Sequence, residues 1–219
     1  MLSRFFNQFF NAISGESKRF SLENRIFNIT CIVTILIAFG GIVLNVINQI
    51  DYRLNIVIII AECGLLILYY FSRFKQQFQS TLITFLIICY ISLGLGWFYN
   101  GGVDGPVIYI ITFFLIVFIS IINVKYQYLW IFTCIAFTLL LFLLEYLHPE
   151  LVAPYYSRKA RFLDLAGSYI IVIVSILTIV LAIKRNYEYE RKKQKYRGQK
   201  LRNKTNSLVN NTKILKTKI

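Results

Sequence analysis

The stretch from Asn100 to Pro106 reads NGGVDGP, and it interrupts a sequence that is otherwise largely apolar from Ile26 to Ile183. Its glycines, aspartate and proline are the residues of a tight turn. Such a short polar stretch cannot cross a bilayer, whose hydrocarbon core is ~30 Å thick. It therefore predicts a point at which the chain leaves a membrane and turns back.

The composition agrees with a membrane protein. Of the 219 residues, 57% are hydrophobic and 16% charged, and the mean hydropathy is +0.62. A water-soluble domain of this size has too small a core to bury so many apolar side chains. The composition therefore predicts a polytopic membrane protein of the all-α class.

Six apolar runs are long enough to span the hydrocarbon core. They comprise residues 26–47, 54–71, 81–99, 107–124, 126–147 and 165–183. We expect a bundle of six transmembrane helices over 26–183, followed by a basic helical extension over 184–219. In the segment 1–25, apolar residues at helical spacing beside Arg4 predict an amphipathic helix on the membrane surface, with a disordered end as the alternative; these are Leu2, Phe5, Phe6, Phe9 and Ile13.

The basic residues predict the orientation. Of the 24 Lys and Arg residues, 13 follow Ile183, and others lie before the first span and after the second and fourth spans: Arg4, Lys18, Arg19, Arg25, Arg73, Lys75 and Lys125. The positive-inside rule then places both termini in the cytoplasm and NGGVDGP outside. The group Arg158, Lys159 and Arg161 opposes this assignment, and Glu150 and Asp164 partly offset its charge. We expect a multi-pass membrane protein with both termini in the cytoplasm.

The basic tail suggests a partner. Residues 184–219 carry 13 basic and 2 acidic side chains, a charge that attracts anionic lipid headgroups. Nucleic acid is not favoured as a partner, because no recognised fold presents a groove-reading element. A seven-residue thread from Val180 through Tyr187 to Leu215 is half of a coiled-coil pattern. It is compatible with a dimeric signalling helix or with a solvated helix that frays after Gly198.

Glu62 is the sharpest single residue, because it lies near the middle of the second span. A carboxylate at that depth is costly and suggests a proton, ion or signal function. The alternative is a structural hydrogen bond to Thr34, Asn45 or Tyr90. Both interpretations stay open.

Other residues give weaker signals. His148 is the only histidine and stands beside Pro149, where a helix-ending turn is expected. The cysteines Cys31, Cys63, Cys89 and Cys134 lack metal-ligand spacing and are expected to be inert buried thiols. Catalytic, cofactor and metal sites are not predicted, because the sequence lacks the motifs that carry such chemistry.

Turn chemistry accounts for the NGGVDGP residues individually. Gly101, Gly102 and Gly105 permit positive φ, Asp104 suits a turn, and Pro106 presets the first turn of the following helix. A plain connector is therefore one interpretation of the stretch from Asn100 to Pro106.

Several short motifs, in order, give a second interpretation. They are ENRIFNI (23–29), YYFSRFK (69–75), FYNGGVDGP (98–106), EYLHPELV (145–152), YYS (155–157), RFLDLAGSYI (161–170) and RNYEYER (185–191). Together they resemble the N-terminal six-span membrane module of sensor histidine kinases of the Bacteroidetes type.

The resemblance implies a signal-input module of a two-component system in a bacterial inner membrane. It also implies a homodimer, because the family signals through paired helices. In the family, a phosphoacceptor hairpin and an ATP-binding domain follow the module, so the expectation is a chain truncated before the kinase core and without autokinase activity. The resemblance also joins NGGVDGP with the loop 149–164, which ends at Asp164, in one sensory face. The rival expectations are a small channel or proton-coupled carrier that uses Glu62, and a membrane anchor that recruits an acidic partner.

Overall fold

The computed structural model describes residues 12–15 and 19–216, and for residues 190, 193, 204 and 206–216 we consider the backbone alone. Every principal element within these residues is helical. The elements are α2 (Leu22–Ile47), α3 (Tyr52–Phe74), α4 (Phe78–Tyr99), η1 (Gly102–Asp104), α5 (Val107–Ile121), α6 (Val124–Leu147), η2 (Pro149–Leu151) and α7 (Arg158–Lys216). The chain divides into two units, Met1–Val180 and Leu181–Ile219. The all-α prediction is confirmed for the described residues.

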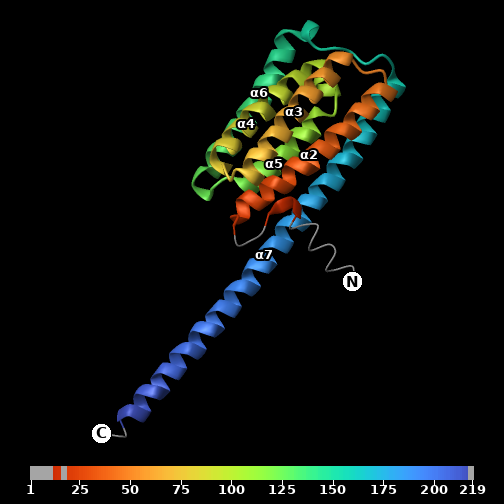
Figure 1. The fold of residues 1–219 in the computed structure, drawn as a ribbon. Coiled ribbons are helices and arrows are strands. Elements are labelled where there is room, and N and C mark those ends of the chain that lie inside the picture. The colour runs from red at the N-terminus through yellow and green to blue at the C-terminus, as the bar shows by residue number, and fades with distance from the viewer. Residues whose placement is uncertain (1–11, 16–18, 217–219) are drawn as a thin grey trace. The chain divides into compact units, whose positions relative to one another are not determined.

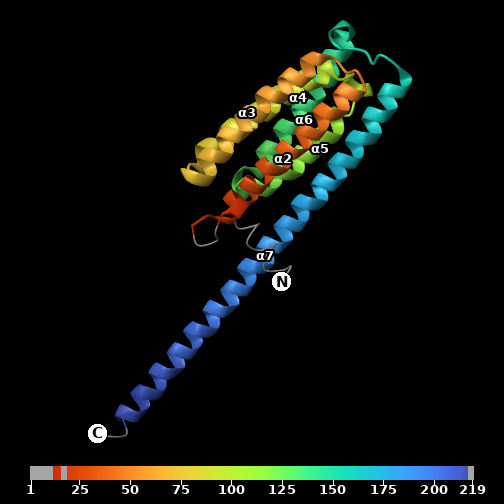
Figure 2. The ribbon, with the colours of Figure 1, turned by 45° about the vertical axis from the view of Figure 1, so that its right-hand side comes forward.

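The first unit is a helical bundle (Figures 1 and 2). The α3 helix packs between α2 and α4, and α5 packs against α2, α4 and α6. Aromatic rings join three of these helices, because Phe85 of α4 lies 5.2 Å from Phe27 of α2 and 6.2 Å from Phe118 of α5, centroid to centroid. All three rings are buried, so this aromatic cluster is part of the bundle core.

The outer surface of the bundle is apolar. Leu36, Ile60 and Phe132 are 68%, 67% and 69% exposed, and five helices have the length and composition to cross a membrane. A surface of this kind is unfavourable in water, because it leaves extensive apolar area hydrated. The protein is therefore membrane-embedded.

The α5 helix differs from the expected span 107–124. It has 15 residues and ends at Ile121, where Ile122 turns to extended backbone. The side chain of Asn123 then caps α6, because its Oδ1 accepts a hydrogen bond from the Lys125 N–H at 3.0 Å. A capping side chain, which hydropathy does not register, thus shortens this helix.

Capping also corrects the expected start of the last apolar helix. Ser157 Oγ accepts a hydrogen bond from the Ala160 N–H at 3.1 Å, and α7 begins at Arg158. Asp164 therefore belongs to a helix, and its assignment to the loop 149–164 is wrong. Of the two alternatives for the tail, the structure has a helix that continues past Gly198, because α7 ends at Lys216.

The N-terminal segment is fastened to the bundle where it is described. Asn28 Nδ2 donates to the Ser14 carbonyl at 2.9 Å, and the Tyr69 hydroxyl donates to the Ile13 carbonyl at 3.1 Å. The Ser72 hydroxyl lies 2.6 Å from Asn28 Oδ1. Four of the residues that predicted an amphipathic helix lie outside the described residues: Leu2, Phe5, Phe6 and Phe9.

Three of the four cysteines are buried, as expected, and the fourth is not. Cys31, Cys89 and Cys134 lie inside the bundle, whereas Cys63 is exposed on α3. The neighbouring Glu62 lines a partly open cavity between the helices. The two side chains therefore project in different directions from the same turn of α3.

Candidate functional site

Three connections meet at one end of the bundle, which we call the distal end: residues 48–51, 100–106 and 148–157. A backbone hydrogen bond joins the last of these segments to the final turn of α4, directly before NGGVDGP, because the Ala153 N–H donates to the Phe98 carbonyl at 2.8 Å. NGGVDGP and the segment after α6 therefore lie side by side.

Two glycines of NGGVDGP are required by their backbone and by their neighbours. Gly101 and Gly102 have φ of +76° and +56°, which non-glycine residues adopt at a cost. A Cβ atom would collide with the Tyr155 ring at Gly101 and with the Glu145 carboxylate at Gly102. The loop is thus fitted to side chains of two other segments, and turn chemistry alone does not account for it.

The expectation of positive φ at Gly105 is wrong. Its φ is −97°, and a Cβ atom there would collide with the Asn100 carbonyl oxygen. Close approach of two backbone segments therefore explains this glycine. Pro106 follows as the N-terminal flanking residue of α5, and its carbonyl accepts a hydrogen bond from the Tyr109 N–H at 2.9 Å.

Glu145 fastens the loop to α6. Its carboxylate accepts hydrogen bonds from the Trp97 Nε1–H at 2.6 Å and from the Val103 N–H at 2.9 Å. Trp97 is fully buried, so its N–H needs an internal acceptor. Glu145 therefore fixes both the end of α4 and the loop that follows it.

Asp164 of α7 is the most buried carboxylate among the described side chains, at 1% exposure. The Tyr155 hydroxyl donates to its Oδ2 at 2.6 Å, and the side chains of Asn100 and Ser168 also hydrogen-bond to the carboxylate. Burial, together with the adjacent Asp164, raises the pKa of Tyr155, which keeps the phenol protonated as a donor. This group of four side chains, the Asp164 network, connects both distal loops to α7.

An ion pair makes a second connection to α7. Arg161 Nη2 lies 2.5 Å from Asp104 Oδ1, and both side chains are partly exposed. Exposed pairs contribute little to stability. The pair places Asp104 on the side of the loop that faces α7.

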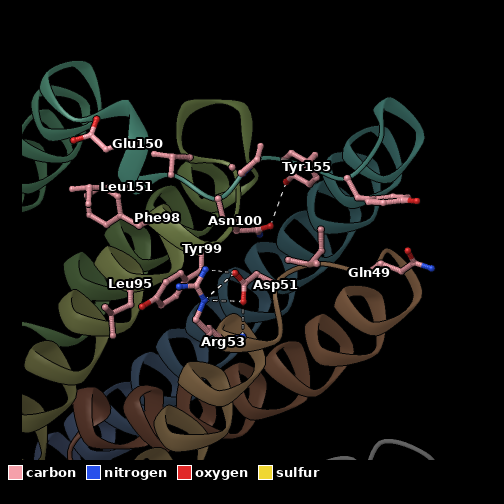
Figure 3. A pocket seen from close by; sticks show the side chains of 16 residues that line it. Gln49, Asp51, Arg53, Leu95, Phe98, Tyr99, Asn100, Glu150, Leu151 and Tyr155 are labelled. Carbon is pink, nitrogen blue, oxygen red and sulfur yellow. Dashed lines mark hydrogen bonds and ion pairs between the residues drawn. The ribbon is translucent and has the colours of Figure 1, made fainter.

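The distal loops enclose a groove of about 830 Å³, which we call the distal groove (Figure 3). Its wall includes Phe98, Tyr99, Asn100 and Tyr155, and its rim carries an ion pair between Arg53 and Asp51 at 2.5 Å. The hydrogen bond from Arg53 lowers the pKa of Asp51. The volume is within the range of small-molecule sites, about 300–1,000 Å³.

Aromatic and charged groups meet in this groove. The Arg53 guanidinium lies 4.8 Å from the Tyr99 ring centroid, in a cation–π geometry. Figure 3 shows Asn100 and Tyr155 in the same wall, on the side away from Glu150. The groove thus has apolar rings with a few hydrogen-bonding groups among them, as ligand sites do.

His148 and Glu62 lie in other places. The imidazole of His148, at the end of α6, lies 3.0 Å from Glu150 Oε1 with both side chains exposed. A hydrogen bond from the backbone of Glu150 itself, and then the one with His148, lower the pKa of the Glu150 carboxyl. Glu62 lines a cavity inside the bundle, and its Oε1 is buried without a hydrogen-bond partner among the described residues.

Two of the three candidate partners of Glu62 form hydrogen bonds with other residues, and the third has no described hydrogen bond. Asn45 donates to Asn55 at 2.9 Å, and Tyr90 shares a hydrogen bond with Thr133 at 3.2 Å. Thr34 Oγ1 is buried without a hydrogen-bond partner in the described part of the chain. The structure therefore gives Glu62 Oε1 none of the three expected hydrogen bonds.

Sequence reasoning missed three residues of the distal end. Glu145 and Tyr155 occur in the motifs of the resemblance, but the sequence does not single out either of them, or Trp97, as a site residue. A carboxylate two residues before the end of an apolar span was the available signal for Glu145.

The distal groove combines aromatic rings with a few hydrogen-bonding groups, which suits the binding of a ligand. Within the described residues, no three His, Cys, Asp or Glu side chains are placed to hold a metal ion. Comparisons with family models, with curated proteins and with solved structures give no match. The site must therefore be interpreted from its own geometry.

We predict that Gly102→Ala destabilises the protein, because it combines positive φ with a collision against Glu145. The expected loss of unfolding free energy is roughly 1–3 kcal/mol. The measurement is the apparent melting temperature in one fixed lipid or detergent, followed by circular dichroism.

Gly94→Ala in α4 is the matched control. Its Cβ atom would meet only the Phe137 ring, at 3.6 Å, and alanine favours a helix over glycine by about 0.5–1 kcal/mol. We expect no loss of stability there. Equal melting temperatures for the two variants would contradict the role assigned to Gly102.

Proposed function

We propose that the chain is the signal-input module of a two-component sensor histidine kinase in a bacterial inner membrane. The distal groove receives the stimulus in this proposal, and α7 carries the response to the cytoplasmic side. The resemblance in sequence motivates the proposal, and the Asp164 network is the observation that carries it.

The Asp164 network gives the proposal a physical coupling. Asn100 and Tyr155 line the distal groove, and both hydrogen-bond to Asp164 on α7. A ligand that engages either side chain competes with a hydrogen bond to a buried carboxylate. Losing such a bond costs about 1–3 kcal/mol, which corresponds to a roughly 5- to 150-fold shift between two states.

In this proposal, two copies of the chain pair through α7 to pass the signal on. In the second unit, α7 exposes Tyr187 and Leu201 by 63% and 66%, and these residues belong to the seven-residue thread seen in the sequence. Apolar side chains at heptad spacing are suited to pairing with a second copy. Displacement of α7 would then alter the relation between paired helices.

The proposed topology has six crossings, with NGGVDGP outside and both termini in the cytoplasm. The α5 helix has 15 residues, about 22 Å at the helical rise, and is therefore short for a span. Its interior position supports a crossing, because α2, α4 and α6 pack around it and reduce its need to match the bilayer thickness.

Labelling of single cysteines tests this topology. With the native cysteines replaced, Val103→Cys is expected to react with a membrane-impermeant maleimide in intact cells, because Val103 is 55% exposed at the distal end. Gln76→Cys, in the connection between α3 and α4, should react only after the cells are permeabilised. The reverse pattern would invert the topology and remove the distal groove from the outside.

Pulsed electron paramagnetic resonance tests the coupling to α7. A spin label at Lys195→Cys in lipid nanodiscs reports the distance between two copies, and we expect Tyr155→Phe to change its distribution. The phenylalanine removes the hydrogen bond to Asp164 while keeping the ring.

Tyr156→Phe is the matched control, because Tyr156 is 83% exposed and does not contact Asp164 through any described hydrogen bond. Its distances should equal those of the wild type. Identical distributions for both variants would refute the coupling, and protein that is strictly monomeric at high density would refute the dimer.

A small proton-coupled carrier is the second candidate, favoured by the unpartnered Glu62 Oε1 inside the bundle. The signal-input proposal predicts that liposomes containing the protein hold a pH gradient as well as empty liposomes. It predicts the same for Glu62→Gln. Gradient loss in the wild type that Glu62→Gln abolishes would support the carrier instead.

A further inference from the structure

A partly open cavity of about 160 Å³ lies between the helices of the first unit. We call it the bundle cavity. Five helices contribute to its wall, represented by Thr34, Glu62, Ser92, Phe113 and Val172. Most of the other lining side chains are aliphatic or aromatic, so the cavity suits an apolar ligand.

Two polar atoms in this wall lack partners. Thr34 is only 8% exposed, and its Oγ1 is buried without a hydrogen bond among the described residues, as is Glu62 Oε1. Each unsatisfied buried group costs about 1–3 kcal/mol. A ligand that hydrogen-bonds to both would recover this cost, which makes the two atoms the polar part of a binding site.

The cavity sets the size of the ligand. An apolar protein cavity of about 150 Å³ accommodates one benzene molecule, and the bundle cavity has a similar volume. The ligand should therefore be no larger than about one aromatic ring.

The wall also sets the charge of the ligand. No Lys or Arg lines the cavity, so an anion would have no counter-charge. A cation would have the carboxylates of Glu62 and Asp164 in the wall, but it would lose its hydration among mostly apolar side chains, at a cost of several kcal/mol. A neutral ligand is therefore favoured.

We propose that the bundle cavity binds a small neutral phenol-like molecule, whose ring fills the apolar volume and whose hydroxyl pairs with Glu62 and Thr34. The hydroxyl donates to Glu62 Oε1 and accepts from the Thr34 hydroxyl. Such a molecule partitions into the bilayer and reaches the protein from the lipid phase.

The cavity wall includes residues of the Asp164 network. Asn100, Asp164 and Ser168 line it together with Val172 of α7. The cavity therefore borders the same helix that the distal loops contact. The binding assignment goes beyond the proposed signal-input function and is tested without reference to any output.

The test is fluorine NMR on protein in lipid nanodiscs, with para-fluorophenol as the probe and empty nanodiscs as the background. Binding to the site is the part that excess phenol displaces. We expect displaceable binding of para-fluorophenol and about tenfold weaker binding of para-fluorotoluene, which has nearly the same shape without the hydroxyl. Absence of displaceable binding, or equal affinity for both probes, would overturn the proposal.

Two substitutions locate the site. Gly41 lines the cavity, and a Cβ atom there meets no atom within 4 Å, so Gly41→Leu should fill the cavity and abolish binding. Gly198→Leu is the matched control, because Gly198 also has an open Cβ position but does not line the cavity. Displaceable binding that survives in folded Gly41→Leu protein would place the probe elsewhere.

Glu62→Met and Glu62→Gln test the polar contact. Methionine keeps the length of the side chain and removes its hydrogen bonding, so we expect about tenfold weaker binding of para-fluorophenol. Glutamine keeps a hydrogen-bonding group and should retain most of the affinity. Unchanged binding in Glu62→Met would remove Glu62 from the site.

Discussion

The burial of the Asp164 carboxylate is the constraint on which the distal end depends. A carboxylate at 1% exposure costs several kcal/mol unless hydrogen bonds replace its water. Asn100, Tyr155 and Ser168 supply these bonds, and the first two come from different loops. Satisfying one carboxylate on α7 therefore determines where both loops run, and the distal groove forms between them.

Glu145 imposes the complementary constraint from α6. It accepts hydrogen bonds from Trp97 and Val103, which stand on either side of Gly101 and Gly102. The stretch 97–105 is consequently held by α6 through one carboxylate and by α7 through another. A ligand that moves this stretch must change the hydrogen bonds of at least one buried or partly buried carboxylate, so the loop has few intermediate positions. Such a loop is better suited to switching between two arrangements than to gradual movement.

Hydropathy predicted the helices, because each apolar run is long enough to span a bilayer. It misplaced several helix ends. The start of α7 depends on the Ser157 cap and the end of α5 on Asn123, and both residues resemble ordinary loop residues in a hydropathy profile. Asp164 was assigned to a loop for the same reason. Its burial inside the bundle becomes favourable only through hydrogen bonds that the folded loops supply, among them the one from the distant residue Asn100. Gly105 shows a similar limit, because its collision is with the backbone of Asn100 and depends on how the loop closes.

The candidate site was less predictable, because several of its contacts join residues that are far apart in the sequence. Trp97 and Glu145 are 48 positions apart, and Asp104 and Arg161 are 57 positions apart. No local pattern encodes such pairs. Glu62 was identifiable as a rare carboxylate in a span, but its surroundings depend on the rotation of α3. Adjacent residues on a helix project about 100° apart, and here Glu62 lines the bundle cavity while Cys63 is exposed. Packing of α3 between α2 and α4 fixes that rotation, so the fold directs the one carboxylate of this helix inward and gives it a cavity to face.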